Sequence, residues 1–283
     1  ESIQKAEEED WNGVVIGNNA KQFSVGANLM NLGMMATQKQ FKPLEELVNN
    51  FQQIMMKIKT SKIPVVTAAQ GYVFGGGCEI AMHSDAGIYA SESYIGLVEV
   101  GVGLLPGGGG TKEFALRASD DFFEGDVKTP TLINYFKTIA TATVSTSAHE
   151  GYNLNYLKKN KDFICMNTPM NIGMAKNKVL ELAKNYIAPT PRKDIEVLGR
   201  GGLSVLYSAI NEFRLGEYMS DYDVVIAKKV AEVICGGDLT SAQKVSEQYL
   251  LDIEREAFMS LLGNQKTLER IQYLLMNNKP LRN

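Results

Sequence analysis

The chain has 283 residues, of which 45% are hydrophobic and 22% are charged, as in ordinary soluble globular proteins. This composition excludes a disordered tail, a collagen-like rod and a small disulfide-stapled protein, and the length suggests one large or two small domains. The formal net charge of −3 gives no reason to expect a nucleic-acid or anionic-membrane surface, so local groups must hold any polyanionic ligand. Three scattered cysteines without CxxC spacing predict reduced thiols, and no apolar run is long enough to span a membrane.

In chain order, the hydrophobic pattern predicts strands that alternate with helices, which is typical of an α/β protein. Residues 1–10 resemble the end of a helix, and because the chain begins at Glu1 rather than Met we expect a fragment whose natural N-terminus is missing. The first half should contain a buried strand at 13–17, helices at 27–35 and 44–58, a strand at 64–69, a glycine-rich turn at 71–77, a helix at 78–85, a strand at 86–90 and a helix at 111–118.

The second half of the chain is predicted to be mainly helical. Residues 118–165 are more polar and irregular, and helical patterns dominate from about residue 168. Thr240 and Gln243 predict a capping-box helix start. A last helix is expected at 267–277, and mobile loops at 189–202 and 235–239.

Two glycine-rich corners between strand and helix suggest a chemical function. In FSVGAN, Ala27 follows Gly26 at a turn into a helix, and in GGGCE, Gly76 opens a helix. Backbone N–H groups in the first turn of a helix have no partner within the helix, and the helix dipole adds partial positive charge there. Two such groups would form an oxyanion hole for a carbonyl oxygen that gains negative charge, such as a thioester becoming an enolate. The alternative is that both corners are ordinary tight turns.

Two glutamates lie in apolar surroundings. Glu79 follows Gly76 by three residues in CEIAM, and Glu99 lies within YIGLVEVGVGLLP. Charged residues are rarely buried unless they are paired or functional, and burial raises a carboxyl pKa toward the range useful for proton transfer. The alternative for each is a core glutamate that caps a backbone N–H or pairs with an arginine.

The sequence gives little evidence for other kinds of catalytic, nucleotide-binding or metal site. The sequence contains no P-loop, GxGxxG, GxSxG or HExxH motif, and two histidines cannot supply a multi-histidine metal site. We expect His83 to end a helix and His149 to lie in a surface loop or at a helix start.

Together, FSVGAN, GGGCEIAM and GLVEVGVGLLPGGGGT resemble the crotonase (enoyl-CoA hydratase/isomerase) superfamily in order and spacing. The stretch VSTSAHEGYNL and the end IEREAFMSLL are also similar to family segments. The resemblance implies a crotonase-type spiral of ββα units over residues 1–188, with the first strand missing, and a C-terminal helical oligomerisation region over 189–283.

The resemblance also implies the roles of individual residues. Ala27 and Gly76 would donate the oxyanion-hole hydrogen bonds, and Glu79 and Glu99 would be the paired acid and base. Asn28 stands where the family usually has Asp. No metal is expected. The implied substrate-binding residues are Val25, Gly26, Asn28, Gly75, Pro106 and Gly107.

Two carboxylates favour a 2-enoyl-CoA hydratase of fatty-acid β-oxidation. The alternatives are a Δ3-Δ2-enoyl-CoA isomerase, which needs one carboxylate, and a non-catalytic oligomerisation module. The insertion near 117–137 and the PLRN ending resemble the hydratase part of bifunctional 3-hydroxyacyl-CoA dehydrogenase/enoyl-CoA hydratase proteins. We therefore expect an acyl-CoA substrate, no cofactor here, NAD only in a missing dehydrogenase part, a homotrimer or a multiple of it, a possible thiolase partner and a cytoplasmic location.

Overall fold

The computed structural model describes residues 1–283, which form two compact units that alternate along the chain. Unit 1 comprises Glu1–Gly26, Gln53–Leu97 and Val144–Pro191, and unit 2 comprises Ala27–Gln52, Val98–Thr143 and Arg192–Asn283. Each unit is therefore assembled from three separate segments. The domain boundary predicted after residue 188 lies near Pro191, the last residue of unit 1. The division into a core at 1–188 and an oligomerisation region at 189–283 stays a prediction.

Unit 1 is built on a parallel sheet in the order β1-β2-β4-β6. The strands are β1 Val14–Gly17, β2 Val65–Ala69, β4 Ala86–Ala90 and β6 Phe163–Cys165. The central strands β2 and β4 are fully buried, as expected for a parallel sheet. The prediction that 13–17 is buried was wrong, because β1 is an edge strand and is half-exposed.

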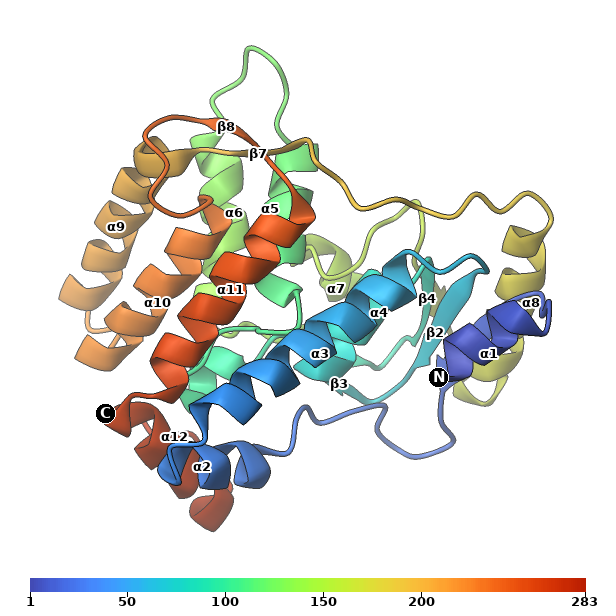
Figure 1. Cartoon of the computed structure of the whole chain (residues 1–283), viewed down its shortest axis with the longest axis horizontal. Helices are drawn as coiled ribbons and strands as arrows, with labels where there is room; N and C mark the ends of the chain where they lie inside the picture. Colours follow the sequence, from blue (N-terminus) through green and yellow to red (C-terminus); the bar gives the residue numbers. More distant parts are fainter. The chain divides into compact units, whose positions relative to one another are not determined.

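One helix of unit 1 covers this sheet. Helix α8, Asn171–Ala183, packs on β1, β2 and β4 through Ala175 and Val179, and Figure 1 shows α8 near β2 and β4. Helix α1, Ser2–Glu8, confirms the helical reading of the first residues. The short elements α7, Ala148–Asn153, and η2, Thr168–Met170, complete the unit.

Helix α4, Gly76–His83, follows two strands, β2 and β3, in a ββα arrangement. Strand β3, Tyr72–Phe74, follows β2 and pairs in parallel with β5, Tyr94–Gly96, which in turn follows β4. Successive strands thus enter two different sheets, and Gly75 alone separates β3 from α4. Residues 71–77 were predicted to be only a turn, but they contain β3, which is too short to produce a detectable alternation.

Unit 2 is mainly helical. Helix α3 begins in unit 2 and ends in unit 1. The bounds of its elements are α2 Leu29–Thr37, α3 Phe41–Lys59, η1 Glu99–Val102, α5 Gly110–Asp120, α6 Thr129–Ala140, β7 Ile195–Val197, α9 Gly199–Leu215, α10 Asp221–Ile234, β8 Gln243–Val245, α11 Glu247–Leu262 and α12 Gln265–Asn277.

Three local predictions in the second half were wrong. Residues 118–165 are not irregular, because α6 buries Leu132 and Phe136 there. The helix expected from Thr240 begins later, since Ser246 caps α11 by accepting a hydrogen bond from the Tyr249 N–H. The loop expected at 189–202 contains β7, which pairs antiparallel with β8, and the first turns of α9. The loop at 235–239 is confirmed.

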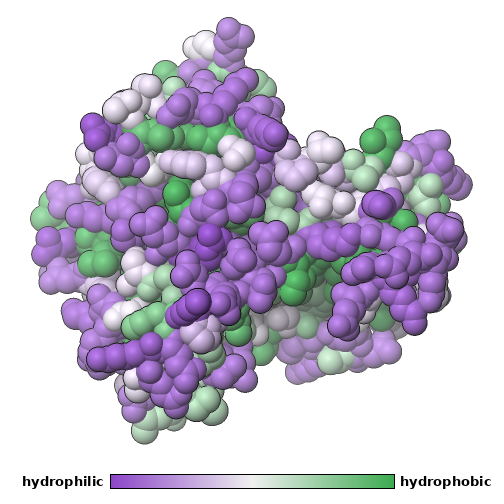
Figure 2. Space-filling model, in the orientation of Figure 1, coloured by the Kyte–Doolittle hydropathy of each residue, from purple (hydrophilic) through white to green (hydrophobic).

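The α/β class predicted from the sequence is confirmed by these elements. All three cysteines are buried and none forms a disulfide. None of the helices combines the length and the apolar character that crossing a membrane requires. Hydrophilic side chains cover most of the face shown in Figure 2, and hydrophobic ones form small separate patches.

Candidate active site

Helix α4 begins at a glycine in a left-handed conformation. Gly75 has φ of +53°, which glycine adopts at little cost, and its N–H donates to the Gly96 carbonyl at 3.0 Å. The next amide, that of Gly76, is at the first position of the helix and donates no hydrogen bond. The positive end of the helix dipole lies at the same place. The Gly76 N–H therefore has the chemistry that its predicted oxyanion role requires.

Glu79 lies in the first turn of α4, and its side chain is buried, with 2% of the residue exposed. Its N–H closes the first turn by donating to the Gly75 carbonyl at 3.0 Å. The carboxylate is thus carried by a backbone that is fixed at the start of the helix.

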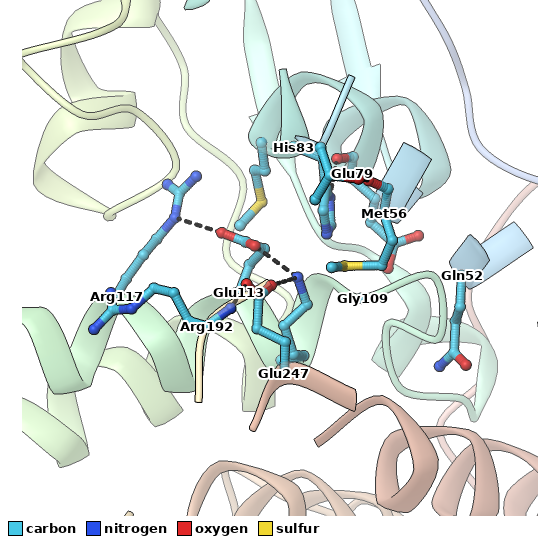
Figure 3. A network of polar contacts seen from close by, with 12 residues as sticks. Gln52, Met56, Glu79, His83, Gly109, Glu113, Arg117, Arg192 and Glu247 are labelled. Carbon is cyan, nitrogen blue, oxygen red and sulfur yellow. Dashed lines mark hydrogen bonds and ion pairs between the residues drawn. The ribbon is translucent and has the colours of Figure 1, made fainter. Parts of the chain in front are cut away.

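The C-terminal half of α4 is held by two polar groups. The His83 Nδ1 lies 2.7 Å from the Glu79 carbonyl oxygen, and because a carbonyl only accepts, Nδ1 carries the hydrogen. Figure 3 shows Glu79 and His83 on this helix. The Lys161 ammonium donates to the carbonyls of Met82 and Ser84, and a cation at a helix C-terminus also complements the dipole. As predicted, His83 ends the helix, while exposed His149 lies at the start of α7.

Gly26 and Val25 follow a short bridge between Ser24 and β3. Ser24 pairs with Val73, and its hydroxyl oxygen accepts the Gly26 N–H at 3.2 Å. Gly26 has φ of +99°, a conformation that disfavours other residues. The Val25 side chain is largely exposed. These residues belong to unit 1, as do Gly75, Gly76 and Glu79.

The other predicted site residues belong to unit 2, and they are Ala27, Asn28, Glu99, Pro106 and Gly107. Ala27 is exposed, and its N–H donates no hydrogen bond. Asn28, which stands where Asp is usual, caps α2 because its side-chain oxygen accepts the Asn31 N–H at 3.1 Å. Asparagine and aspartate cap helices about equally well, so this departure preserves the helix start.

Glu99 is the first residue of the short helix η1 and is partly buried. Its carbonyl accepts the Leu104 N–H at 3.1 Å, and the Val100 carbonyl accepts the Gly103 N–H at 3.1 Å. With Gly103 left-handed at φ of +87°, these two bonds form a Schellman motif. The backbone of Glu99 is therefore part of a closed turn.

The loop after η1 carries Pro106 and Gly107 and is held by helix α11. Gly107 approaches the Phe258 ring so closely that a Cβ there would lie 2.5 Å from Cδ2. The carboxylate of fully buried Glu254 accepts the N–H groups of Gly109 at 2.6 Å and Lys112 at 2.8 Å. The Glu254 carboxylate of α11 thus lies at the positive end of the α5 dipole, and its hydrogen bonds fix the loop.

Sequence reasoning missed a buried ion cluster in unit 2. The Lys112 ammonium lies 2.7 Å from Glu113 Oε1 and 2.9 Å from Glu247 Oε2. Burial alone would lower the pKa of Lys112, but the two carboxylates raise it above its usual value, so Lys112 is charged. Figure 3 shows the Glu113 and Glu247 side chains converging, with Arg117 beside Glu113. Glu247 lies 135 residues from Lys112, so the sequence hinted at this cluster only through TKE, which carries Lys112 and Glu113 in an apolar helix.

No group of three or more His, Cys, Asp or Glu side chains is arranged to hold a metal ion. Unit 1 contains the unused Gly76 N–H and the buried Glu79 carboxylate, and unit 2 contains the unused Ala27 N–H and the partly buried Glu99 carboxylate. Amide donors suit an oxygen that gains negative charge, and carboxylates suit proton transfer.

Comparison with known proteins identifies relatives by sequence. Residues 1–121 match the family model described as enoyl-CoA hydratase/isomerase. The chain is 42% identical over 279 residues to a probable 3-hydroxyacyl-CoA dehydrogenase of Bacillus subtilis, covering 98% of this chain and 34% of that protein. It is 30% identical to a putative fatty acid oxidation complex trifunctional enzyme of Rickettsia felis, covering 97% of this chain and 34% of that protein. The chain thus spans about a third of the length of these two relatives.

Solved structures confirm the fold. A carnitinyl-CoA dehydratase from Mycobacterium thermoresistibile matches with a TM-score of 0.66 at 13% identity, covering 98% of this chain and 80% of that one. An enoyl-CoA hydratase from Rhodobacter sphaeroides matches with a TM-score of 0.64 at 16% identity, covering 99% and 82%. At these identities the likeness concerns the fold alone, and it confirms the crotonase-type architecture that the motifs predicted.

Proposed function

We propose that this chain, a member of the enoyl-CoA hydratase/isomerase (crotonase) superfamily, is a 2-enoyl-CoA hydratase that adds water reversibly to trans-2-enoyl-CoA. The observation that carries the proposal is the presence of two shielded carboxylates, Glu79 and Glu99, each in the first turn of a short helix. The unused N–H groups of Ala27 and Gly76 support it, because a thioester carbonyl that becomes an enolate needs such donors.

In the proposed reaction, one carboxylate removes a proton from water as the water oxygen bonds to the β-carbon. The electron pair of the double bond moves toward the thioester, whose oxygen accepts hydrogen bonds from the Ala27 and Gly76 N–H groups. The second carboxylate, protonated at the start, then gives its proton to the α-carbon. We assign water activation to Glu79 and protonation to Glu99. The substrate carries the CoA, so this chemistry needs no further cofactor.

The test is hydration of crotonyl-CoA, followed by the loss of absorbance of its conjugated thioester. Glu79→Gln and Glu99→Gln keep the size of each side chain but remove its proton transfer, and each should lower kcat by about a hundredfold or more. Glu92→Gln, at an exposed site in unit 1, is the matched control and should leave kcat unchanged. Normal turnover by Glu99→Gln would remove Glu99 from the mechanism.

Two other functions of the same fold are distinguished by further measurements. An isomerase needs a single carboxylate, so it would convert 3-enoyl-CoA and tolerate Glu79→Ala much better than a hydratase does. A non-catalytic oligomerisation module would show neither turnover nor binding of acetoacetyl-CoA in isothermal titration. The presence of both glutamates favours the hydratase.

We also propose that the chain is part of a longer fatty-acid oxidation enzyme that carries a 3-hydroxyacyl-CoA dehydrogenase. The proposal is supported by the relatives from Bacillus subtilis and Rickettsia felis, which are three times as long and carry names from that chemistry. A hydratase product is a 3-hydroxyacyl-CoA, which is the substrate of such a dehydrogenase. NAD would be needed only by that part.

A further inference from the structure

Helix α12 contacts the turn that carries Glu99. Thr267, at the start of this helix, is fully buried, and its Oγ1 donates to the Gly103 carbonyl at 2.7 Å. A Cβ on Gly103 would lie 2.8 Å from that hydroxyl oxygen, so the approach is as close as glycine permits. The contact spans 164 residues of sequence and lies wholly within unit 2.

The hydroxyl of Thr267 is oriented by a second residue. Tyr222 Oη lies 2.6 Å from Thr267 Oγ1. Because the single hydroxyl proton of Thr267 goes to the Gly103 carbonyl, Tyr222 is the donor in this second bond. The result is a chain of hydrogen bonds from Tyr222 through Thr267 to Gly103. Such chains strengthen each member in a buried setting.

A second carbonyl of the η1 turn, that of Val100, also accepts a hydrogen bond from a residue of α12. The Arg270 Nη1 lies 3.4 Å from the Val100 carbonyl oxygen, and the guanidinium is 1% exposed and paired with Asp223 at 2.7 Å. The Schellman motif of η1 is therefore braced at Val100 and at Gly103. If Gly103 rotated, the Leu104 N–H would lose the Glu99 carbonyl, and the Glu99 side chain would move with its backbone.

We infer that Thr267, with Tyr222 behind it, is a positioning residue for Glu99. Its hydroxyl fixes the left-handed Gly103 and so fixes the backbone from which the Glu99 carboxylate reaches the substrate. The inference rests on the proposed hydratase function for its effect on turnover, but its effect on the η1 turn is independent of that function.

The test compares Thr267→Val, which is nearly isosteric but lacks the hydroxyl, with Thr267→Ser, which keeps the hydroxyl. We expect Thr267→Val to lower kcat for crotonyl-CoA hydration about tenfold with little change in KM, the loss that one hydrogen bond entails. Thr267→Ser should recover most of that loss. Thr138→Val makes the same change at a buried threonine of α6 and is the matched control, with kcat unchanged.

Two readouts separate positioning from general destabilisation. In a Glu99→Gln background, Thr267→Val should have little further effect, because the group that it positions no longer transfers a proton. Amide exchange at Leu104 should become faster in Thr267→Val and stay slow in Thr267→Ser and Thr138→Val. If Thr267→Val folds poorly, Tyr222→Phe removes only the donor to Thr267 and should give a smaller loss of the same kind.

The outcomes distinguish the inference from the proposed function. Normal turnover and normal Leu104 exchange in Thr267→Val would overturn the inference, as would an equal loss in the Glu99→Gln background. An inactive wild-type chain would contradict the hydratase proposal, and Leu104 exchange would then still decide whether Thr267 holds the turn.

Discussion

The glycines of this chain differ in the space that is available for a side chain. A Cβ on Gly107 would lie 2.5 Å from the Phe258 ring, whereas one on Gly201 would meet nothing within 4 Å. Phe258 is buried, so its ring has neighbours on its other sides as well. The loop before α5 is thus shaped by contact with a specific ring, and glycine at 107 is required by space.

We therefore expect Gly107→Ala to lower the free energy of unfolding by about 1–3 kcal/mol, as overpacking does. Gly201→Ala, at an exposed position in the first turn of α9, should be neutral or stabilising. Urea unfolding of both variants measures the difference. Gly107→Ala combined with Phe258→Leu should recover part of the loss, and a Gly107→Ala variant as stable as the wild type would contradict the contact.

At the scale of elements, an ion pair joins the start of α10 to α12. Asp223 forms a capping box with Ser220, and its carboxylate also accepts the Arg270 guanidinium at 2.7 Å. Burial alone would raise the pKa of Asp223, but the hydrogen bonds from the Ser220 N–H and Arg270 lower it below its usual value. A lowered pKa means that this carboxylate stabilises the fold in its charged form.

Asp223→Asn leaves Arg270 buried without its anion, which should cost about 3–5 kcal/mol of unfolding free energy at pH 7. The stabilisation is fully present above the unfolded-state pKa of about 3.9 and is lost as the pH falls through the lower folded value. The difference between wild type and variant, measured by urea unfolding at several pH values, should therefore shrink only below about pH 4.

The neighbouring Asp221 supplies the matched control. It pairs with Arg214 at 2.8 Å, but both side chains are more than half exposed. Asp221→Asn should change the unfolding free energy by less than about 1 kcal/mol, because exposed ion pairs contribute little. An equally large loss in both variants would show that negative charge in the first turn of α10, rather than the contact with α12, is responsible.

The order of the segments along the chain decides which of the two units an N-terminal fragment can contain in full. All three segments of unit 1 lie before residue 192, but unit 2 needs residues 192–283. A fragment of residues 1–188 lacks Glu247 and Glu254, so the buried Lys112 loses one of its two carboxylate partners and the N-terminus of α5 loses its carboxylate.

We expect this fragment to keep slow amide exchange in the buried strands β2 and β4 but to lose it in α5. Hydrogen exchange read by residue, with the full chain as reference, measures both regions at once. Protection of α5 equal to that in the full chain would mean that residues 1–188 fold as a complete domain, as the sequence prediction had it.

Much of the local structure was readable from residue types. The order of strands, glycine corners and helices came from apolar runs and from glycines such as Gly26 and Gly75, which do adopt positive φ. Helix α6 was missed although Leu132, Phe136 and Ile139 follow helical spacing, because threonine, asparagine and Pro130 weakened the local helical signal.

The fold class, the family resemblance and the candidate residues Ala27, Gly76, Glu79 and Glu99 could all be read from the amino-acid sequence. These follow from local chemistry, since a glycine corner or a glutamate among apolar residues is unusual wherever it occurs. The contacts that hold the turn of Glu99 and the start of α5 became visible only in the folded chain. Thr267, Glu254 and Glu247 lie 164, 145 and 135 residues from Gly103, Gly109 and Lys112, and no periodicity links positions that meet only when helices pack.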